Sequence, residues 1–307
     1  MLSFTEIQDY FRKNYETVVY DFALTNSLRG PTYISGRIQK CRFCLTDIEA
    51  SDQQKKHAIS EFLGNEKVYL RQECRACNPQ LSVFESSFAR YLMFERSLAQ
   101  IKGKKGIPKF ESTNSQFWVS PYDKGIEVGY GKTADFTVNH EKREVKLTAE
   151  RPRYIPFDIH LSLLKYALSL MPERRLPPFE QSRLFIRRYG VGSSLKPVMF
   201  ESQIMPVRKA PLVRLLFRRP NSIDMRVPYA QIILDVARYR FQTFIPSTQE
   251  RARNLELVPY MTEHQTPPEA KDLSSKTERT GEKVPFTFQY FGPVFFPKPP
   301  PGFRNGG

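Results

Sequence analysis

Hydrophobic residues recur at helical spacing in three stretches of the chain, and each stretch predicts an amphipathic helix. The first stretch covers residues 4–24. The second begins at Asn78, a suitable N-cap, with Pro79 at the first helical position, and it runs toward Ile101. The third covers residues 158–171, with Asp158 as its expected cap, and ends before a proline. These stretches supply the helical part of the fold that we expect.

Apolar and polar residues alternate in shorter stretches bounded by turn residues, and these stretches predict strands. One short strand ends near His57 and another covers residues 68–71, with Gly64 and Asn65 marking the turn between them. From about residue 110 onward the predicted strands are short, the first four forming an antiparallel meander and the last two a hairpin. They cover residues 116–119, 125–129, 135–138, 143–147, 184–188, 198–204, 212–217, 231–236 and 241–245.

At 307 residues the chain is long enough for two domains, and changes in composition indicate where they begin. We expect an amino-terminal helix in residues 1–30, a cysteine-containing module in residues 31–106 and an α+β domain in residues 107–261. Residues 262–307 combine a polar stretch typical of a flexible linker with an aromatic and proline-rich tail. The aromatic segment 286–291 is expected to add a strand to the protein's own sheet or to that of a partner.

All four cysteines of the chain lie in two Cys-x-x-Cys pairs, and this spacing predicts a zinc site. The pairs are Cys41 with Cys44 and Cys74 with Cys77. A Cys-x-x-Cys turn supplies two thiolates from one tight loop, and two such turns complete the tetrahedral set that structural Zn²⁺ prefers. A redox dithiol needs only one pair. We therefore expect four reduced cysteines that hold Zn²⁺.

The residues around these pairs resemble a known family. Residues 57–61 read His-Ala-Ile-Ser-Glu, residues 63–65 read Leu-Gly-Asn, and Asn78 directly follows the last cysteine. With the predicted order of strand, turn, strand and helix, this segment resembles the HNH endonuclease family, in the branch where a treble-clef zinc site flanks the catalytic hairpin. The resemblance implies an α+β fold in which a zinc-stapled ββα-metal module precedes an α+β domain rich in antiparallel sheet.

The resemblance also implies a role for two side chains. In this family the histidine at the position of His57 is the general base that takes a proton from water, and a neutral imidazole suits that role. The asparagine matching Asn78 helps to hold one divalent metal, Mg²⁺ or Mn²⁺, whose charge stabilises the transition state. The resemblance therefore predicts His57 and Asn78 as the catalytic pair.

The sequence departs from the family pattern just before the histidine. The family has an acid there as the second metal ligand, whereas this chain has Lys56, which cannot bind a hard cation while it is charged. Glu85 follows Asn78 by seven residues and so shares its helix face, which makes Glu85 the replacement ligand that we expect. Glu61 and Asp52 are weaker alternatives.

The charge of the chain predicts a polyanionic partner. The net charge is +15 and the isoelectric point is near 9.6, a surplus that favours binding to phosphates through counterion release. An acidic membrane surface and simple solubility are the alternatives, and no apolar run approaches the length of a membrane-spanning helix. Paired reduced cysteines and the lack of a signal-peptide pattern predict a cytoplasmic protein. Basic residues expected to contact DNA are Lys56, Arg90, Lys102, Lys104 and Lys105.

The sequence thus predicts a metal-dependent endonuclease that hydrolyses phosphodiester bonds in DNA, a function that by analogy with the family suits phage defence. The alternative is a zinc module that binds nucleic acid or a protein partner without catalysis, its site having degenerated at Lys56. Two further questions stay open at this point. One is whether the protein forms a homo-oligomer, and the other is whether residues 107–261 bind an activating ligand or partner.

Overall fold

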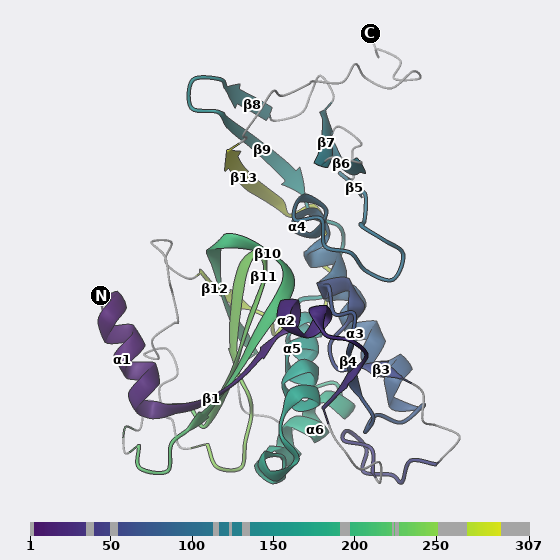
Figure 1. Cartoon of the computed structure of the whole chain (residues 1–307), viewed down its shortest axis with the longest axis vertical. Coiled ribbons are helices and arrows are strands. Elements are labelled where there is room, and N and C mark those ends of the chain that lie inside the picture. Colours follow the sequence, from purple (N-terminus) through teal and green to yellow (C-terminus); the bar gives the residue numbers. More distant parts are fainter. Residues whose placement is uncertain are drawn as a thin grey trace.

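A mixed α+β architecture is seen in the computed structural model, with a four-stranded sheet beside a group of helices and smaller sheets around them (Figure 1). The structure describes residues 3–34, 40–49, 55–112, 117–122, 125–130, 136–190, 197–222, 224, 227–250 and 269–289.

The largest sheet is built around one long strand. β10 pairs with β11 along its length, with β1 along its second half and with β12 along its first few residues, and every pairing is antiparallel. The strands are β1 (Tyr15–Asp21), β10 (Val198–Arg218), β11 (Ala230–Phe244) and β12 (Glu269–Asp272). Because β1 comes from the amino-terminal part of the chain, this sheet ties the two ends of the sequence together.

One central helix, α5 (Pro156–Leu170), is buried along its entire length between this sheet and α3 (Cys77–Tyr91). Its sequence is apolar on nearly every side, which is the pattern of a helix that packs on all faces. The prediction of a helix over residues 158–171 is confirmed, but its expected cap at Asp158 is wrong. The Asp158 carboxylate instead accepts hydrogen bonds from Ser87 at 2.9 Å and from Tyr189 at 2.9 Å.

The amino-terminal region differs from the single helix that the sequence predicts. α1 (Phe4–Asn14) begins with a capping box between Ser3 and Glu6, and the chain then continues as β1 and as the short helix α2 (Phe22–Ser27). The expectation of a helix over residues 4–24 is therefore wrong beyond Asn14. The β-branched run in β1 favours a strand, and pairing with β10 supplies its hydrogen bonds.

The cysteine-containing part of the chain forms a small three-stranded sheet followed by helices. β2 (Thr32–Tyr33) pairs parallel with β4 (Val68–Leu70), which pairs antiparallel with β3 (Lys56–His57). The helix expected to run toward Ile101 is confirmed, but as two helices, α3 and α4 (Met93–Leu98), with a break at Leu92.

Two further sheets extend from one end of the molecule (Figure 1). The strands of the expected meander are divided between these two sheets. The two sheets, together with Phe94 of α4, enclose a separate small hydrophobic core. β13 pairs with β9, so the aromatic segment near the carboxyl terminus does add a strand to the protein's own sheet. The strands are β5 (Phe110–Glu111), β6 (Phe117–Tyr122), β7 (Gly125–Tyr130), β8 (Phe136–Asn139), β9 (Glu144–Glu150) and β13 (Lys283–Gln289).

Three predictions for the second half are wrong. Residues 184–187 belong to a helix, α6 (Glu180–Arg187), and Arg188 is its C-cap, so this segment is not a strand. The two strands predicted within β10 are one strand, and the hairpin predicted within β11 is one strand that passes through a bulge at Ala237, where φ is 52°. The expected linker contains β12 and the start of β13, while residues 262–268 and the tail beyond residue 289 lie outside the described residues.

The main hydrophobic core is continuous across the two halves of the chain. It joins apolar residues of the cysteine-containing part, such as Phe43 and Leu81, to α5 and to β11. Short 3-10 helices complete the structure at Glu61–Leu63, Glu173–Arg175 and Pro177–Phe179. Within the described ranges, no helix has both the length and the apolar character needed to cross a membrane.

Candidate zinc centre and histidine site

The four cysteines come together as the sequence predicts. Their sulfur atoms all lie within 4.8 Å of one another, and the sulfurs of Cys44 and Cys74 are 3.6 Å apart. Four thiolates around one Zn²⁺ at about 2.3 Å would lie roughly 3.8 Å from each other. All four are free thiols rather than disulfides. The cluster therefore fits a tetrahedral metal such as zinc.

The hydrogen bonds to the sulfur atoms also support a role as metal ligands. Backbone N–H groups of Phe43 and Cys74 point at the sulfur of Cys41, each at 3.4 Å. A hydrogen bond from Cys77, together with backbone N–H groups, lowers the pKa of Cys41 to about 4 in spite of its burial. The Cys77 thiol, which shares its proton with Cys41 and is buried, has a raised pKa. Such donors stabilise thiolate, the form that binds metal.

The first cysteine turn is anchored to α5 by a buried arginine. Nη1 of Arg42 donates to the backbone carbonyls of Leu168 at 2.8 Å, Ser169 at 2.9 Å and Met171 at 2.6 Å. A guanidinium at this position satisfies the unpaired carbonyls of a helix end and complements its dipole. The guanidinium also donates to Gln72. The zinc centre is consequently fixed against the central helix.

A buried asparagine holds the hairpin that carries His57. Nδ2 of Asn65 donates to the carbonyls of Ile59 at 2.7 Å and Val68 at 2.9 Å, and its Oδ1 accepts from the N–H of Val68 at 2.9 Å. Asn65 is only 1% exposed, so these bonds are shielded from water. They join the loop after β3 to the start of β4 and so fix the position of His57.

His57 lies on β3 with one ring nitrogen facing a carboxylate. Its Nε2 is 3.3 Å from Oε1 of Glu61, and its ring packs against Tyr69 with centroids 4.6 Å apart. An ionised carboxylate only accepts hydrogen bonds, so the tautomer of the neutral ring that suits this contact carries its proton on Nε2 and its lone pair on Nδ1. That Nδ1 is buried and has no hydrogen-bond partner.

The surroundings of His57 keep it neutral near pH 7. Burial lowers the pKa of His57 below its ordinary value, and this effect outweighs the opposing charge of Glu61. The ammonium of Lys165 lowers the pKa further, the carboxylate of Glu85 raises it, and Lys104 lowers it again. A neutral imidazole with an unpartnered nitrogen is chemically a base.

Glu85 occupies a buried charge cluster. Its Oε1 accepts a hydrogen bond from Nζ of Lys165 at 2.9 Å, and the same ammonium lies 4.0 Å from Oε2 of the fully buried Glu73. Lys165 comes from α5, in the half of the chain for which the sequence suggests no role in the site. The carboxylate expected to bind a divalent metal is thus already paired with a cation.

Asn78 has a different place in its helix from the one expected. α3 begins at Cys77 after Ala76, with no side-chain cap, so the prediction that Asn78 caps the helix is wrong. Asn78 lies in the first turn with its backbone N–H donating to the carbonyl of Cys74 at 3.2 Å, and its side chain is half-buried. It shares a helix face with Glu85, two turns further along.

The basic residues predicted to contact DNA separate into two groups. Lys56 is buried, with its ammonium donating to the backbone carbonyl of Glu73 at 2.5 Å, so it points into the protein rather than toward a phosphate. The other four are exposed on α3 and on the loop after α4, where a polyanion can reach them: Arg90, Lys102, Lys104 and Lys105.

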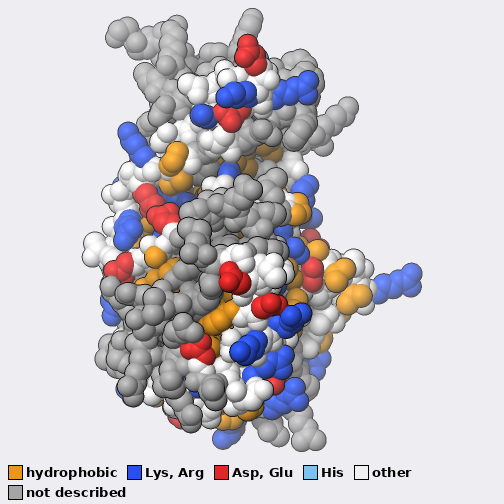
Figure 2. Space-filling view, turned by 90° about the vertical axis from the view of Figure 1, so that its left-hand side faces the viewer, with side chains coloured by type: hydrophobic (Ala, Val, Ile, Leu, Met, Phe, Trp, Pro, Cys, Tyr) orange, Lys and Arg blue, Asp and Glu red, His pale blue; other side chains and the backbone are white. Residues whose placement is uncertain are grey.

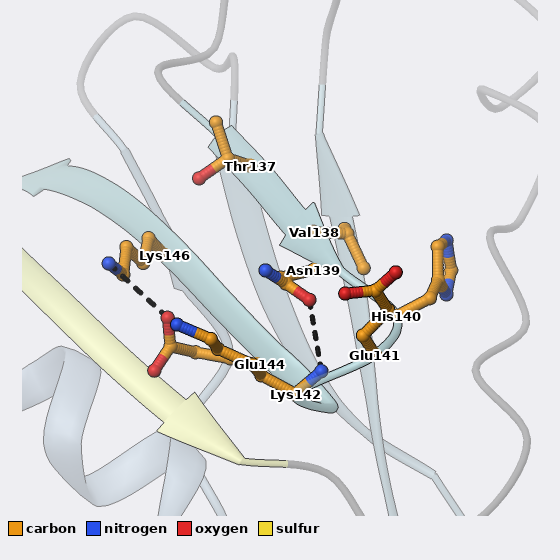
Figure 3. Close-up of a pocket in the computed structure, with 8 residues that line it drawn as sticks. All are labelled: Thr137, Val138, Asn139, His140, Glu141, Lys142, Glu144 and Lys146. Atoms are coloured by element: carbon orange, nitrogen blue, oxygen red, sulfur yellow. Dashed lines mark hydrogen bonds and ion pairs between the residues drawn. The ribbon is translucent and has the colours of Figure 1, made fainter.

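One surface hollow lies far from this site along the molecule. It is lined by the turn between β8 and β9, with a cavity volume of about 480 Å³, and includes the exposed His140 (Figure 3). In Figure 3 the Asn139 side chain accepts from the N–H of Lys142 at 2.9 Å, and Lys146 pairs with Glu144 at 3.3 Å. These contacts stabilise the turn, and the hollow presents no convergent set of catalytic side chains.

Sequence reasoning missed two residues of the histidine site. The Leu-Gly-Asn turn signal pointed to Asn65 but not to its three buried bonds. For Lys165 the only signal was a lysine inside an otherwise apolar helix, which is unfavourable unless the charge is paired. The structure supplies that pairing from α3.

Comparison with protein-family models, with curated proteins and with solved structures found no match. The function is therefore argued from the site alone.

Proposed function

We propose that the protein is an endonuclease of the HNH type that hydrolyses phosphodiester bonds in DNA, with His57 as the general base. The observation that carries the proposal is the arrangement of His57: a ring with its proton directed to Glu61, an unpartnered Nδ1, and a hairpin locked by Asn65. Base catalysis requires a nucleophile-activating nitrogen in a defined tautomer and position. The position of His57 is fixed by the hairpin, and its contact with Glu61 favours one tautomer, which supports the proposal.

In this proposal the chain's own residues perform the proton transfer. This step requires that substrate binding opens the buried Nδ1 of His57 to water. Nδ1 then accepts a proton from the water as it attacks phosphorus, while the phosphorus–oxygen bond to one sugar breaks and the leaving oxygen takes a proton from solvent. The positive charge that develops on the ring is stabilised by Glu61 at 3.3 Å. Lys104, which is exposed and close enough to influence His57, is a suitable contact for the phosphate. The four cysteines would hold zinc, which cross-links the two cysteine turns that flank the hairpin.

The expected Mg²⁺ or Mn²⁺ site on Asn78 and Glu85 does not fit the donors that the structure brings together. Glu85 is paired with Lys165, and the four cysteines are the one group of three or more metal-binding side chains within the described ranges. Hard divalent cations prefer several oxygen ligands, including carboxylates that are not already neutralised. We therefore assign no catalytic step to a divalent cation, and the assay below measures whether one is required.

The overall charge supports a nucleic-acid substrate. A net charge of +15 favours association with a polyanion. Figure 2 shows Lys and Arg side chains gathered at the lower right of the face where α1 and the large sheet lie in Figure 1, which is the side away from β3. A basic surface of this kind binds backbone phosphate without reading sequence.

A second candidate function is binding of nucleic acid without cleavage. Two observations favour it: the acid expected before His57 is the buried Lys56, and the expected metal ligand Glu85 holds Lys165. The position of the family's acid is thus a lysine, and the carboxylate expected to replace that acid is paired with a second lysine. In that case the histidine hairpin is a structural remnant.

The two candidates are separated by cleavage of supercoiled plasmid with zinc-loaded protein, with and without added Mg²⁺ or Mn²⁺. Chelators are unsuitable as the control because removing zinc unfolds such modules. We expect the wild type and His140→Ala, which changes an exposed histidine on the β8–β9 turn, to nick the plasmid equally. We expect His57→Ala to lose at least about 100-fold in rate. Equal rates for His57→Ala and the wild type would refute the proposal, and a salt-sensitive gel shift without cleavage would support the binding function.

A further inference from the structure

The outward face of the β2–β4–β3 sheet carries a row of aromatic rings. Tyr33 is opposite Tyr69 in the parallel pair, and Tyr69 is opposite His57 in the antiparallel pair. Side chains at paired positions point to the same face of a sheet. The row therefore crosses all three strands and ends at the proposed catalytic base.

The distances show that the rings form one continuous surface. The centroids of Tyr33 and Tyr69 are 5.9 Å apart with a 38° angle between the rings, and those of Tyr69 and His57 are 4.6 Å apart with a 44° angle. All three rings are partly exposed. Within the described part of the chain, neither tyrosine belongs to a hydrophobic core cluster or packs against one.

The side chains on the opposite face of the same sheet have a purely structural role. Alternation places Val68 and Leu70 of β4 and Lys56 of β3 on the inner side, and all three are buried. The inner face thus provides the packing that holds the sheet on the protein. The outer tyrosines contribute little to that packing, and the hydrogen bond from the Tyr69 hydroxyl to the carbonyl of Glu66, at 3.1 Å, involves the hydroxyl and not the face of the ring.

Two cations flank the aromatic row. The guanidinium of Arg71 lies 3.9 Å from the centroid of the Tyr33 ring, and Nζ of Lys55 lies 6.0 Å from that of Tyr69. Arg71 directly follows β4 and Lys55 directly precedes β3, and these distances place both cations beside the rings. Glu61 is the carboxylate beside His57. Aromatic rings interleaved with cations are the surface on which unpaired bases stack while the backbone is neutralised.

We infer that this face is a stacking platform for the bases of a single-stranded nucleic acid, and that it delivers the adjoining phosphodiester to His57. Bases in a duplex are stacked on each other and hide their π faces, so a platform of rings selects single-stranded or unpaired nucleotides. The row ends at His57, so a strand whose bases lie on Tyr33 and Tyr69 brings its next phosphate to the base. The inference rests on the proposed function only in this last step, because binding to the platform does not require cleavage.

The test is fluorescence anisotropy with the full, zinc-loaded chain and no added Mg²⁺ or Mn²⁺. The probes are labelled oligothymidine and oligouridine of about 15 nucleotides, a length that suits known single-strand binding sites, and a DNA duplex of equal length. We expect the single strands to bind more tightly than the duplex. The two single-strand probes distinguish DNA from RNA as the natural ligand.

The variants identify the surface. Tyr69→Ala and Tyr33→Ala are each expected to weaken single-strand binding by about 5- to 100-fold, the loss typical of one stacked base. Tyr69→Phe keeps the ring and is expected to bind within about twofold of the wild type, because stacking needs the π face and not the hydroxyl. Tyr122→Ala is the matched control, since Tyr122 is 67% exposed on β6, in a different sheet. Zinc content and melting temperature show that each variant is folded.

Three results would overturn the inference: equal affinity for duplex and single strand, unchanged binding by both alanine variants, or a loss with Tyr69→Phe as large as with Tyr69→Ala. If Tyr69→Ala fails to fold, Tyr33→Ala and Tyr69→Phe decide the question alone. Single-strand binding that depends on the rings, without any cleavage when Mg²⁺ is added, would support the platform and refute the nuclease. Cleavage that depends on His57 but not on the tyrosines would support the nuclease and overturn the platform.

Discussion

Replacement of Asn65 by alanine tests whether the histidine hairpin is held as the structure indicates. The change removes three hydrogen bonds, at 2.7 to 2.9 Å, from a residue that is 1% exposed. A hydrogen bond contributes about 0.5–1.5 kcal/mol net, and a buried group left unpaired costs more. The three bonds together predict a loss of about 3 kcal/mol in the free energy of unfolding.

The matched control is Asn139→Ala, which removes one side-chain hydrogen bond, to the N–H of Lys142, in an exposed turn. This control should lie within about 0.5 kcal/mol of the wild type. For Asn65→Ala we expect the melting temperature to fall by roughly 5–10 °C. Hydrogen exchange at the N–H of Val68 should also be faster, because that group loses its acceptor. Melting and exchange equal to those of the control would refute the role assigned to Asn65.

Three further perturbations test the surroundings of the site. Exhaustive zinc removal, or Cys74→Ser, should unfold the cysteine turns and lower the melting temperature, and near-identical melting with and without zinc would contradict the zinc site. Lys165→Met leaves the buried Glu85 carboxylate unpaired and should lower the free energy of unfolding by about 3–5 kcal/mol. Adding Glu85→Gln to the same chain should restore part of this stability. A double variant that is no more stable than Lys165→Met would contradict this pairing. Full burial lowers the pKa of His160 to about 4, so the folded state resists its protonation. Stability should therefore be undiminished above pH 6.5 and fall as the pH drops toward 4, by about 2 kcal/mol at pH 5. Melting curves of His160→Leu between pH 7.5 and 5 should lack this part of the loss, and an unchanged pH dependence would contradict the assignment.

The sequence correctly predicted those elements whose spacing of hydrophobic residues or cysteines fits only one type of structure. α5 has apolar residues at helical spacing and ends before a proline, and its observed bounds differ little from the expected ones. The cysteine spacing likewise predicts a metal site, because two Cys-x-x-Cys turns supply the four thiolates that tetrahedral zinc requires. In these cases the local chemistry and the final fold agree, so no information from distant residues is needed.

Where the sequence prediction failed, distant contacts decided the outcome. Tyr15, Val18 and Phe22 have helical spacing, yet residues 15–21 form a strand because β10 lies alongside and satisfies their backbone. Residues 184–188 read as a strand from their apolar run, but Phe185 and Ile186 are buried with Ser182 on one helical face. Both segments are short, and for short apolar runs the periodicity does not separate helix from strand.

The residues of the histidine site also divide into those that local spacing identifies and those that only the fold brings together. His57 and the cysteines were identified from local spacing, since both belong to one continuous segment. The pairing of Glu85 with Lys165 joins residues eighty positions apart, and nothing in either segment indicates the other. The aromatic row was equally hidden, because it depends on the register between three short strands.

Chemical rescue of His57→Gly by imidazole tests most directly whether His57 is the base. The variant removes the ring and leaves space beside Glu61 and Tyr69, the two side chains that contact it. If His57 is the base, single-strand or plasmid cleavage should be lost in the variant and restored by added imidazole. The restored rate should rise with pH as imidazole becomes neutral, and His140→Gly should neither lose activity nor respond. Cleavage that persists in His57→Gly, or that imidazole leaves unchanged, would contradict the assignment of His57 as the base.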